Sequence, residues 1–332
     1  MNKKNPKLIC IGDVVMDAFI TLKEARVHNH PDREHLEICM PFGDKIPYES
    51  LMVAVAVGNA SNVAVGASRL GIDTSMLTAV GNDHYGKEIL DWYQKEKVSA
   101  TLVRVNKGKP TNYHFVLNYG PERTILIKHQ DYDYYDPARL GPADWIYFSS
   151  IGEHTLGFHA KVAAYLKKHP ETRMAFNPGT FQLKFGAKKL REIYRMTYAL
   201  FVNRAEAEHI LGAKRDNIRA LLAGLRRLGP KIVVITDGPL GAYASDDGSC
   251  YFMPPYPDPR PPVSRTGAGD AFSTGFLSAL IYGFSVPEAL RWAPIESMHV
   301  VQSFGAQTGL LTKPALLQLL KKAPKSYRPK LL

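Results

Sequence analysis

Short apolar runs alternate along the chain with stretches in which apolar residues recur at helical spacing. The apolar runs predict buried strands over residues 8–11, 75–80, 145–149, 174–176, 200–203 and 231–236. The helical spacing predicts helices over residues 58–70, 86–95, 158–168, 205–211 and 217–228. Such alternation is typical of a parallel sheet with right-handed crossovers and helices on both faces. The pattern therefore predicts an α/β fold whose ligands bind beyond the carboxyl ends of the strands.

One segment interrupts this alternation. Residues 113–118 and 124–127 are β-rich runs on either side of the turn Tyr119-Gly120-Pro121-Glu122, and no helix follows them, which indicates a hairpin. Together with the irregular residues 14–50, this hairpin is expected to form a small β-sheet lid on the core. We therefore expect a core over residues 1–325, a lid from about 14–50 and 101–130, and a basic tail over 322–332.

The lid segment also carries three closely spaced histidines, His28, His30 and His35. They lie in an irregular stretch that contains proline, and no acidic residue is near them in helical register. We interpret this stretch as a solvated lid loop rather than as a metal site.

The composition is that of an ordinary globular protein, because 45% of the residues are hydrophobic and 22% are charged. Disordered and fibrous chains are thereby excluded. The three cysteines form no C-x-x-C pair, which favours a reduced compartment, and no apolar run approaches the ~18 residues of a membrane span. We expect a soluble, cytoplasmic protein without a membrane partner.

The chain is basic, since it contains 42 Lys and Arg residues but only 31 Asp and Glu residues, which gives a formal net charge of +11. The excess is scattered over predicted helix surfaces and gathered near the end of the chain. No basic run is interleaved with aromatic residues, and no nucleic-acid motif matches. We therefore expect a solvated basic surface and no nucleic-acid partner.

The segment with the clearest chemistry is Ser264-Arg265-Thr266-Gly267-Ala268-Gly269-Asp270, which precedes an apolar helix that reaches Tyr282. Two glycines around one alanine allow a tight turn, so that backbone N–H groups at the helix N-terminus can face a phosphate. An acid on the first helical turn can then take a proton from a hydroxyl group while a phosphoryl group is transferred. The alternative is an ordinary helix start, with Thr266 as the cap and Asp270 as a first-turn acid.

Four other segments of the chain form a set of motifs together with this one, and the order and spacing of the set are informative. They are 57–64 with 69–71, then 81–86, then Asn203-Arg204-Ala205-Glu206, and lastly Thr236-Asp237-Gly238-Pro239-Leu240-Gly241. With these five motifs in register, the chain resembles the ribokinase (PfkB) family of carbohydrate and nucleoside kinases over most of its length. The resemblance implies a three-layer αβα core with a mostly parallel sheet, a β lid, and transfer of the γ-phosphoryl group of ATP to a hydroxyl.

The resemblance also implies the catalytic residues. Asp270 would be the general base, and the backbone of Gly267, Ala268 and Gly269 would form the anion hole.

For the acceptor, the resemblance implies Asp17, Gly58, Asn59 and Asn62 as binding residues. A carboxylate such as Asp17 can accept hydrogen bonds from two neighbouring hydroxyls, although a solvated turn residue is the alternative. Asn59 could equally be a helix cap. Arg123 lies on the expected lid, where it could meet a charged substrate group or only an exposed glutamate.

For the nucleotide, the resemblance implies contacts from Asn203, Thr236, Gly238 and Gly241. Glu206 would hold Mg²⁺ indirectly, through water, because Mg²⁺ keeps several waters and uses few carboxylates. A surface glutamate on the first turn of a helix is the alternative interpretation of Glu206.

The motif that ends at Asp270 departs from the family's pattern in its first two residues. The family usually has Asp-Thr where this chain has Ser264-Arg265, so the carboxylate of the family's monovalent-cation site is missing. Arg265 could instead place a fixed positive charge beside the phosphates.

These expectations together describe an ATP- and Mg²⁺-dependent kinase that phosphorylates a hydroxyl, most simply a primary one, of a sugar or sugar-like molecule. The alternatives are a nucleoside kinase of the same family and a non-catalytic sugar or nucleotide sensor on this scaffold. A β lid with an open edge could also pair with a second copy to form a homodimer.

Overall fold

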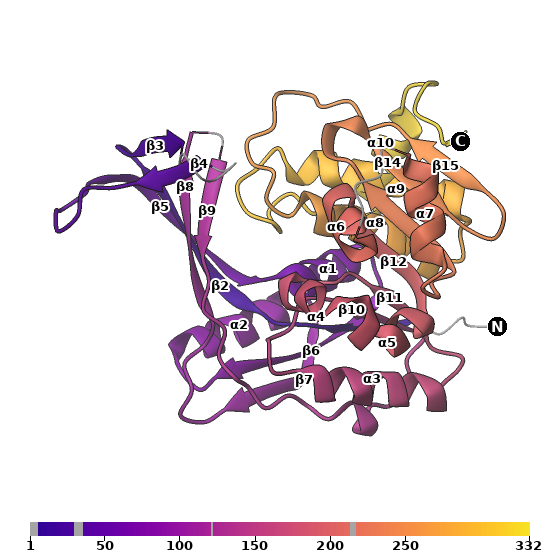
Figure 1. Ribbon diagram of the computed structural model, residues 1–332, viewed down its shortest axis with the longest axis horizontal. Helices are drawn as coiled ribbons and strands as arrows, with labels where there is room; N and C mark the ends of the chain where they lie inside the picture. The colour runs from indigo at the N-terminus through magenta and orange to yellow at the C-terminus, as the bar shows by residue number, and fades with distance from the viewer. Residues whose placement is uncertain (1–5, 30–35, 121, 213–216) are drawn as a thin grey trace.

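A computed structural model gives the structure of the chain and describes residues 6–29, 36–120, 122–212 and 217–332. Its core is a ten-stranded sheet in the order β16-β15-β14-β13-β12-β11-β10-β1-β6-β7 (Figure 1). These strands are β1 (Lys7–Ile11), β6 (Asp73–Gly81), β7 (Ser99–Asn106), β10 (Trp145–Phe148), β11 (Arg173–Phe176), β12 (Thr197–Asn203), β13 (Ile232–Thr236), β14 (Ala242–Ser245), β15 (Cys250–Met253) and β16 (Lys330–Leu331). The pairs from β7 to β13 are parallel, and those from β13 to β16 are antiparallel.

Helices cover both faces of this sheet. They are α1 (Asn59–Arg69), α2 (His84–Lys95), α3 (Leu156–Lys168), α4 (Thr180–Lys189), α5 (Arg191–Met196), α6 (Arg204–Leu211), α7 (Ile218–Arg226), α8 (Ala268–Ile281), α9 (Val286–Val300) and α10 (Lys313–Lys322), with short 3₁₀ turns η1 (Pro137–Arg139) and η2 (Gly238–Leu240). Side chains of α1, α8 and α9 share one buried cluster with Leu8 and Cys10 of β1. Side chains of α3, α5 and α7 share the other with Ile9 and Ile11. Successive strand residues face opposite sides, so the central strands β1, β10 and β13 are buried on both faces and a three-layer core results.

A second, four-stranded sheet stands out from one side of the core as a lid (Figure 1). Its order is β5-β2-β8-β9, from β5 (Tyr48–Val57), β2 (Val15–Leu22), β8 (Tyr113–Tyr119) and β9 (Glu122–Leu126). Strands β3 (Arg26–Asn29) and β4 (Leu36–Cys39) pair separately at its far end. The predicted α/β fold with a mostly parallel sheet and a small β lid is therefore confirmed.

The lid boundaries differ from those predicted. Residues 101–106 belong to β7, which pairs with β6 in the core sheet, and residues 51–57 belong to the lid strand β5. Residues 14–50 were expected in the lid, but the individual strands β2 and β5 were not predicted, because part of the apolar surface of this region stays exposed and its alternation is broken by β-bulges.

The end of the chain also differs from the expected solvated tail. Strand β16 pairs with the edge strand β15, and Tyr327 is buried with its hydroxyl donating to the Arg291 carbonyl at 2.6 Å. The basic residues around Tyr327 point outward while the tyrosine anchors the segment. Composition alone does not reveal such an anchor.

Helix α9 was another element that the sequence did not predict. It contains Pro294 in its interior and is apolar around most of its circumference, because it packs between α8 and the sheet. Helical periodicity is weak in a helix that is buried on nearly all sides. Among the described helices, none combines the length and the apolar character needed to cross a membrane.

Glu296 on α9 is a fully buried carboxyl group. One oxygen accepts a hydrogen bond from the Leu311 N–H at 3.2 Å, and the other has no partner in the described part of the chain. Burial raises the pKa of Glu296 to about 8, despite the opposing effects of that hydrogen bond and of Arg69. The folded protein therefore holds a proton near neutral pH that the unfolded chain releases.

This proton makes stability depend on pH in a defined direction. From about pH 4.5 to about pH 8 the unfolded state binds fewer protons, so the free energy of unfolding should fall as pH rises, by up to about 5 kcal/mol. Glu296→Gln cannot ionise and should lose this decline. We expect its melting temperature, relative to wild type, to increase between pH 5 and pH 8.5 in thermal unfolding.

Glu288→Gln is the matched control, because Glu288 lies on the same helix with a partly exposed side chain. It should follow the wild-type curve. Parallel curves for wild type and Glu296→Gln would show that Glu296 does not titrate in this range.

Candidate active site

Helix α8 begins at a tight turn that exposes backbone N–H groups. Gly267 has φ of +80°, and a Cβ there would lie 2.5 Å from the Cβ of Ala306, so glycine is required for both reasons. The N–H of Ala268 donates to the Arg265 carbonyl over a long 3.3 Å. Within the described residues, the N–H groups of Gly267 and Gly269 have no acceptor. This turn can therefore bind an anion with Gly267 and Gly269, while Ala268 must weaken an internal bond to join them.

Asp270 lies on the first turn of α8 with only 9% of the residue exposed. Asn59 Nδ2 donates to its Oδ1 at 2.8 Å, and Asn62 Nδ2 donates to its Oδ2 at 2.7 Å. Burial raises the pKa of Asp270, whereas the two amide hydrogen bonds act in the opposite direction. The result is a carboxylate that accepts protons more readily than an exposed one and that is held in a fixed orientation.

The two asparagines stand at the start of α1, directly after lid strand β5. Gly58 precedes the helix with φ of +121°, and a Cβ there would lie 2.6 Å from the Asp13 carbonyl oxygen. Ala56 has φ of +55°, which is unusual for a residue with a side chain, and its carbonyl accepts bonds from Ser61 Oγ and Gln307 Nε2. The sharp junction between β5 and α1 turns Asn59 and Asn62 toward Asp270.

Asp17 is in lid strand β2 and faces His114 of strand β8. Their registered positions place Asp17 Oδ1 3.5 Å from His114 Nδ1. The Asp17 side chain is 17% exposed, so it is not a solvated turn residue. In the described residues its Oδ1 makes no hydrogen bond, and neither does His114 Nε2. Both atoms are buried polar groups whose hydrogen-bonding capacity is unused, a capacity that a bound ligand could satisfy.

A second aspartate, Asp13, bonds the segment that follows lid strand β9 to the end of core strand β1. It follows Gly12 at the end of β1, and it accepts hydrogen bonds from Tyr134 Oη at 2.6 Å and His129 Nδ1 at 3.0 Å. The His129 ring also lies edge-on to His114, with centroids 5.1 Å apart. The pairs Asp17–His114 and Asp13–His129 are thus contiguous.

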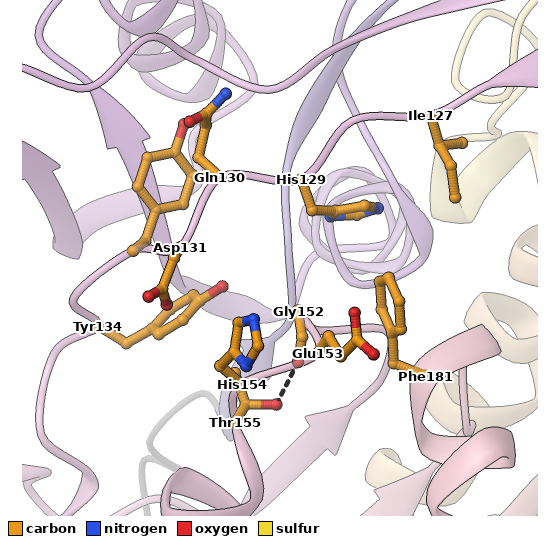
Figure 2. Close-up of a pocket in the computed structure, with 11 residues that line it drawn as sticks. Ile127, His129, Gln130, Asp131, Tyr134, Gly152, Glu153, His154, Thr155 and Phe181 are labelled. Atoms are coloured by element: carbon orange, nitrogen blue, oxygen red, sulfur yellow. Dashed lines mark hydrogen bonds between the residues drawn. The ribbon is translucent and has the colours of Figure 1, made fainter.

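A cavity of about 240 Å³ opens beside His129. Figure 2 shows His129 and Phe181 of α4 on one part of its wall, with Tyr134 and Asp131 opposite and Glu153 and His154 from the loop after β10. The rings of His129 and Phe181 are nearly perpendicular, with centroids 5.4 Å apart. Aromatic and acidic side chains together suit a molecule that has both a flat face and hydrogen-bond donors.

The expected nucleotide residues gather at the carboxyl ends of β12 and β13. Asn203 and Thr236 are registered partners at the ends of these two strands. Gly238 and Gly241 have positive φ in the loop after β13, where a Gly241 Cβ would lie 2.5 Å from the Met253 carbonyl oxygen. These positions form one edge of the sheet, as the parallel topology requires.

Glu206 forms a capping box with Asn203. Its Oε2 accepts the Asn203 N–H at 2.8 Å, while Asn203 Oδ1 accepts the Glu206 N–H at 2.9 Å. Burial raises the pKa of Glu206, and the charge of Asp270 adds to this rise. A half-buried carboxylate in the field of a second one is an environment that fits a divalent cation. Glu206 therefore both begins α6 and remains suited to an indirect metal contact.

The two arginines singled out from the sequence are both exposed. Arg123 is registered with Asn118 on β8, on the same face of the lid as Asp17 but further along the strands. Arg265 precedes the α8 turn, and its neighbour Ser264 accepts the Thr266 N–H at 3.2 Å, so Ser264 supports the turn.

The histidine cluster lies only partly within the described residues. His28 is exposed on β3, whereas His30 and His35 lie outside the described residues. Across the described ranges, no group of three or more His, Cys, Asp or Glu side chains is arranged to hold a metal.

The structure thus joins Asn59, Asn62 and Asp270 directly. It places the other expected residues at the start of α1 (Gly58), at the start of α8 (Arg265, Gly267, Ala268 and Gly269), at or just after the ends of β12 and β13 (Asn203, Glu206, Thr236, Gly238 and Gly241) and on the lid (Asp17 and Arg123). Sequence reasoning did not find Asp13, His114, His129 or Gln307. Asp13 carried one usable signal, since an acid directly follows a buried strand and Gly12. The others take their meaning from contacts between segments far apart in the chain.

The α8 turn gives a direct test of anion binding. Gly267→Ala would place a methyl group against Ala306 and distort the turn. We expect the affinity for a non-hydrolysable ATP analogue to fall about 10- to 100-fold, since a hydrogen bond to a charged group contributes about 1.5–3 kcal/mol. Calorimetric titration would measure it. Gly283→Ala, with φ of +85° and open space around it, is the matched control and should bind as wild type does.

Comparison with known proteins agrees with this geometry. The chain is 29% identical over 276 residues to ribokinase of Bacillus subtilis, covering 79% of this chain and 87% of that protein. It is 27% identical over 261 residues to a nucleoside kinase of Methanothermobacter thermautotrophicus, covering 76% and 80%. The structure of Arabidopsis thaliana ribokinase complexed with ribose and ATP matches with a TM-score of 0.78 at 20% identity, covering 96% and 99%. Since the model of the pfkB family carbohydrate kinases matches residues 6–313, this chain belongs to that family.

Proposed function

We propose that this carbohydrate kinase transfers the γ-phosphoryl group of ATP to a hydroxyl, most simply a primary one, of a sugar or sugar-like molecule, with Asp270 as the general base. One observation carries the proposal. Asp270 is buried, oriented by two amides, and located on the first turn of the helix whose N-terminal N–H groups at Gly267 and Gly269 have no acceptor in the described part of the chain. A base and an anion site are thereby adjacent, as phosphoryl transfer requires.

The reaction moves one proton and one phosphoryl group. The acceptor hydroxyl gives its proton to a carboxylate oxygen of Asp270, while its oxygen forms a bond to the γ-phosphorus. The bond from the γ-phosphorus to the oxygen bridging to ADP breaks, and ADP leaves with that oxygen. The raised pKa of Asp270 favours proton uptake, and the N–H groups at Gly267 and Gly269 stabilise charge on the transferring group.

The nucleotide is proposed to lie along the ends of β12 and β13, against Asn203, Thr236, Gly238 and Gly241. Arg265 would place its charge beside the phosphates. Glu206 would hold Mg²⁺ through water, and the ion supplies neutralisation of phosphate charge when bound. Closure of the lid would exclude the water that otherwise hydrolyses ATP.

The acceptor is proposed to lie between the lid and the start of α1, near Asp17, Gly58, Asn59 and Asn62. Asp17 Oδ1 and His114 Nε2 offer an acceptor and a ring nitrogen to neighbouring hydroxyls. Arg123 lies on the same lid face and would meet a charged group of a longer substrate.

A nucleoside is the second candidate acceptor, and the cavity beside His129 favours it. That cavity adjoins Asp17 through the His114–His129 contact and has aromatic walls suited to a base. Thermal shifts with sugars, sugar phosphates and nucleosides, each with a non-hydrolysable ATP analogue, would distinguish the classes. A coupled assay of ADP release would exclude the non-catalytic sensor if any of these acceptors supports turnover.

Replacing the base should stop transfer without stopping nucleotide binding. We expect Asp270→Asn to lower kcat about 10²- to 10⁴-fold or more, because the amide cannot take the proton. Its affinity for an ATP analogue should remain near that of wild type. Steady-state ADP release and calorimetry measure the two quantities.

Asp73→Asn, at an exposed position at the start of β6, is the matched control and should leave both unchanged. Near-normal turnover by Asp270→Asn would refute the assignment of the base.

We further propose that the chain pairs with a second copy through the lid. The face opposite Asp17 carries four exposed apolar side chains, Leu51, Val53, Phe115 and Leu126. Val53 and Phe115 are both registered with Ala18, and Leu126 is registered with Phe115, so three of them form one row. A contiguous apolar patch of this kind on an open sheet fits a partner of the same kind.

Sedimentation equilibrium would measure the assembly. We expect twice the chain mass for wild type, and the single mass for Val53→Lys combined with Leu126→Lys, because two charges would replace the centre of the patch. Leu317→Lys, on the exposed side of α10, is the control and should remain dimeric. A monomeric wild type at micromolar concentration would contradict the proposal.

A further inference from the structure

We propose that Gln307 is a positioning residue that fixes the side-chain amide of Asn62 so that its N–H group always faces Asp270. The inference rests on the proposed role of Asp270 and adds a residue that neither the motifs nor the family comparison brought into the site. Gln307 lies in the loop after α9, in a segment distant in sequence from both Asn62 and Trp92.

A continuous series of hydrogen bonds supports this role. Trp92 Nε1 donates to Gln307 Oε1 at 2.9 Å, and Gln307 Nε2 donates to Asn62 Oδ1 at 3.0 Å. Asn62 Nδ2 then donates to Asp270 Oδ2 at 2.7 Å. Gln307 and Asn62 are each only 4% exposed, so water does not compete for these groups.

Trp92 determines which group donates and which accepts in each of these hydrogen bonds. The indole N–H of Trp92 can donate but cannot accept, so the oxygen of the Gln307 amide must face it. The nitrogen of Gln307 then faces two acceptors, the Ala56 carbonyl at 2.7 Å and Asn62 Oδ1. If the Asn62 amide rotated by 180°, its oxygen would face a carboxylate and its nitrogen would face another N–H donor. Both contacts would be repulsive, so only one orientation is stable.

Gln307 itself is held by a neighbouring ion pair. Arg69 Nη1 donates to the carbonyls of Gln307 and Leu310, at 2.7 Å and 3.1 Å. The same guanidinium makes two bonds of 2.8 Å to the Glu96 carboxylate, which fixes its plane. The backbone of Gln307 is therefore located independently of its side chain, and a side-chain substitution should leave the loop in place.

The consequence for Asp270 is electrostatic. The Asn62 hydrogen bond lowers the pKa of Asp270 against the effect of burial, so losing its fixed orientation should raise that pKa. The other groups in the field of Asp270 are Glu206 of α6 and Tyr147 of β10, whose own pKa values its charge raises. Neither contacts Gln307, so a Gln307 substitution should act through Asn62 alone.

The test is Gln307→Leu, which keeps the approximate shape but removes the donor and the acceptor. We expect kcat at neutral pH to fall about tenfold or more, as part of the 10²- to 10⁴-fold that a general base contributes. The acid limb of the kcat profile should move to higher pH, so that activity recovers partly as pH rises. Trp92→Phe removes only the terminal donor and should shift the limb in the same direction by less.

Gln302→Leu is the matched control. Gln302 is also buried after α9, but it bonds to Arg260 and not to Asn62. It should leave the pH profile unchanged even if it lowers the melting temperature. A Gln307→Leu profile that keeps its midpoint, or a kcat equal to that of wild type, would overturn the inference. If Gln307→Leu does not fold, the Trp92→Phe profile decides in the same way.

A second readout does not require turnover. In protein labelled with [¹⁵N]asparagine, the side-chain amide signal of Asn62, assigned by its loss in Asn62→Asp, should titrate with Asp270 and stop titrating in Asp270→Asn. Gln307→Leu should move that midpoint to higher pH, and an unmoved midpoint would refute the positioning role. The turnover of Asp270→Asn tests the proposed base, whereas the Asn62 signal tests the positioning role of Gln307. Failure of the proposed function and failure of this inference are therefore distinguishable.

Discussion

The site depends on how the free-energy cost of burying the Asp270 carboxylate is offset. Removing Asp270 from water disfavours its charged form, and two amide N–H groups from α1 offset part of that cost. The balance leaves a carboxylate whose pKa is raised and whose orientation is fixed by two hydrogen bonds. Because both amides come from the first turn of α1, the placement of that helix against α8 determines the surroundings of the Asp270 carboxylate.

The parallel topology gathers the remaining groups. Strands β1, β12 and β13 end at the same edge of the sheet, so Asp13, Asn203 and Thr236 reach that edge from distant parts of the chain. The N-terminus of α8 adds N–H groups to it. The lid supplies Asp17 and His114 from two adjacent strands. The sheet edge and the lid thus contribute polar side chains from separate segments of the chain.

The sequence predicted those features that depend on residues close together in the chain, and it missed those that depend on residues far apart. Apolar runs identified six of the ten strands of the core sheet, namely β1, β6, β10, β11, β12 and β13. The segment around Asp270 could be identified from glycines at a helix start, because both patterns are local. Strand β2 and helix α9 were missed, since neither shows a clean alternation or helical period. The roles of Gln307 and His129 rest on partners more than a hundred residues away, which one sequence does not reveal.

The junction at Ala56 links the lid to the two amides that bind Asp270. Strand β5 runs into α1 with a single residue, Gly58, between them, and the Ala56 carbonyl is held from two sides. A rotation of the lid about this point would turn the first residues of α1 as well. A displacement of β5 at this point would therefore be transmitted through the backbone to the hydrogen bonds that Asn59 and Asn62 donate to Asp270.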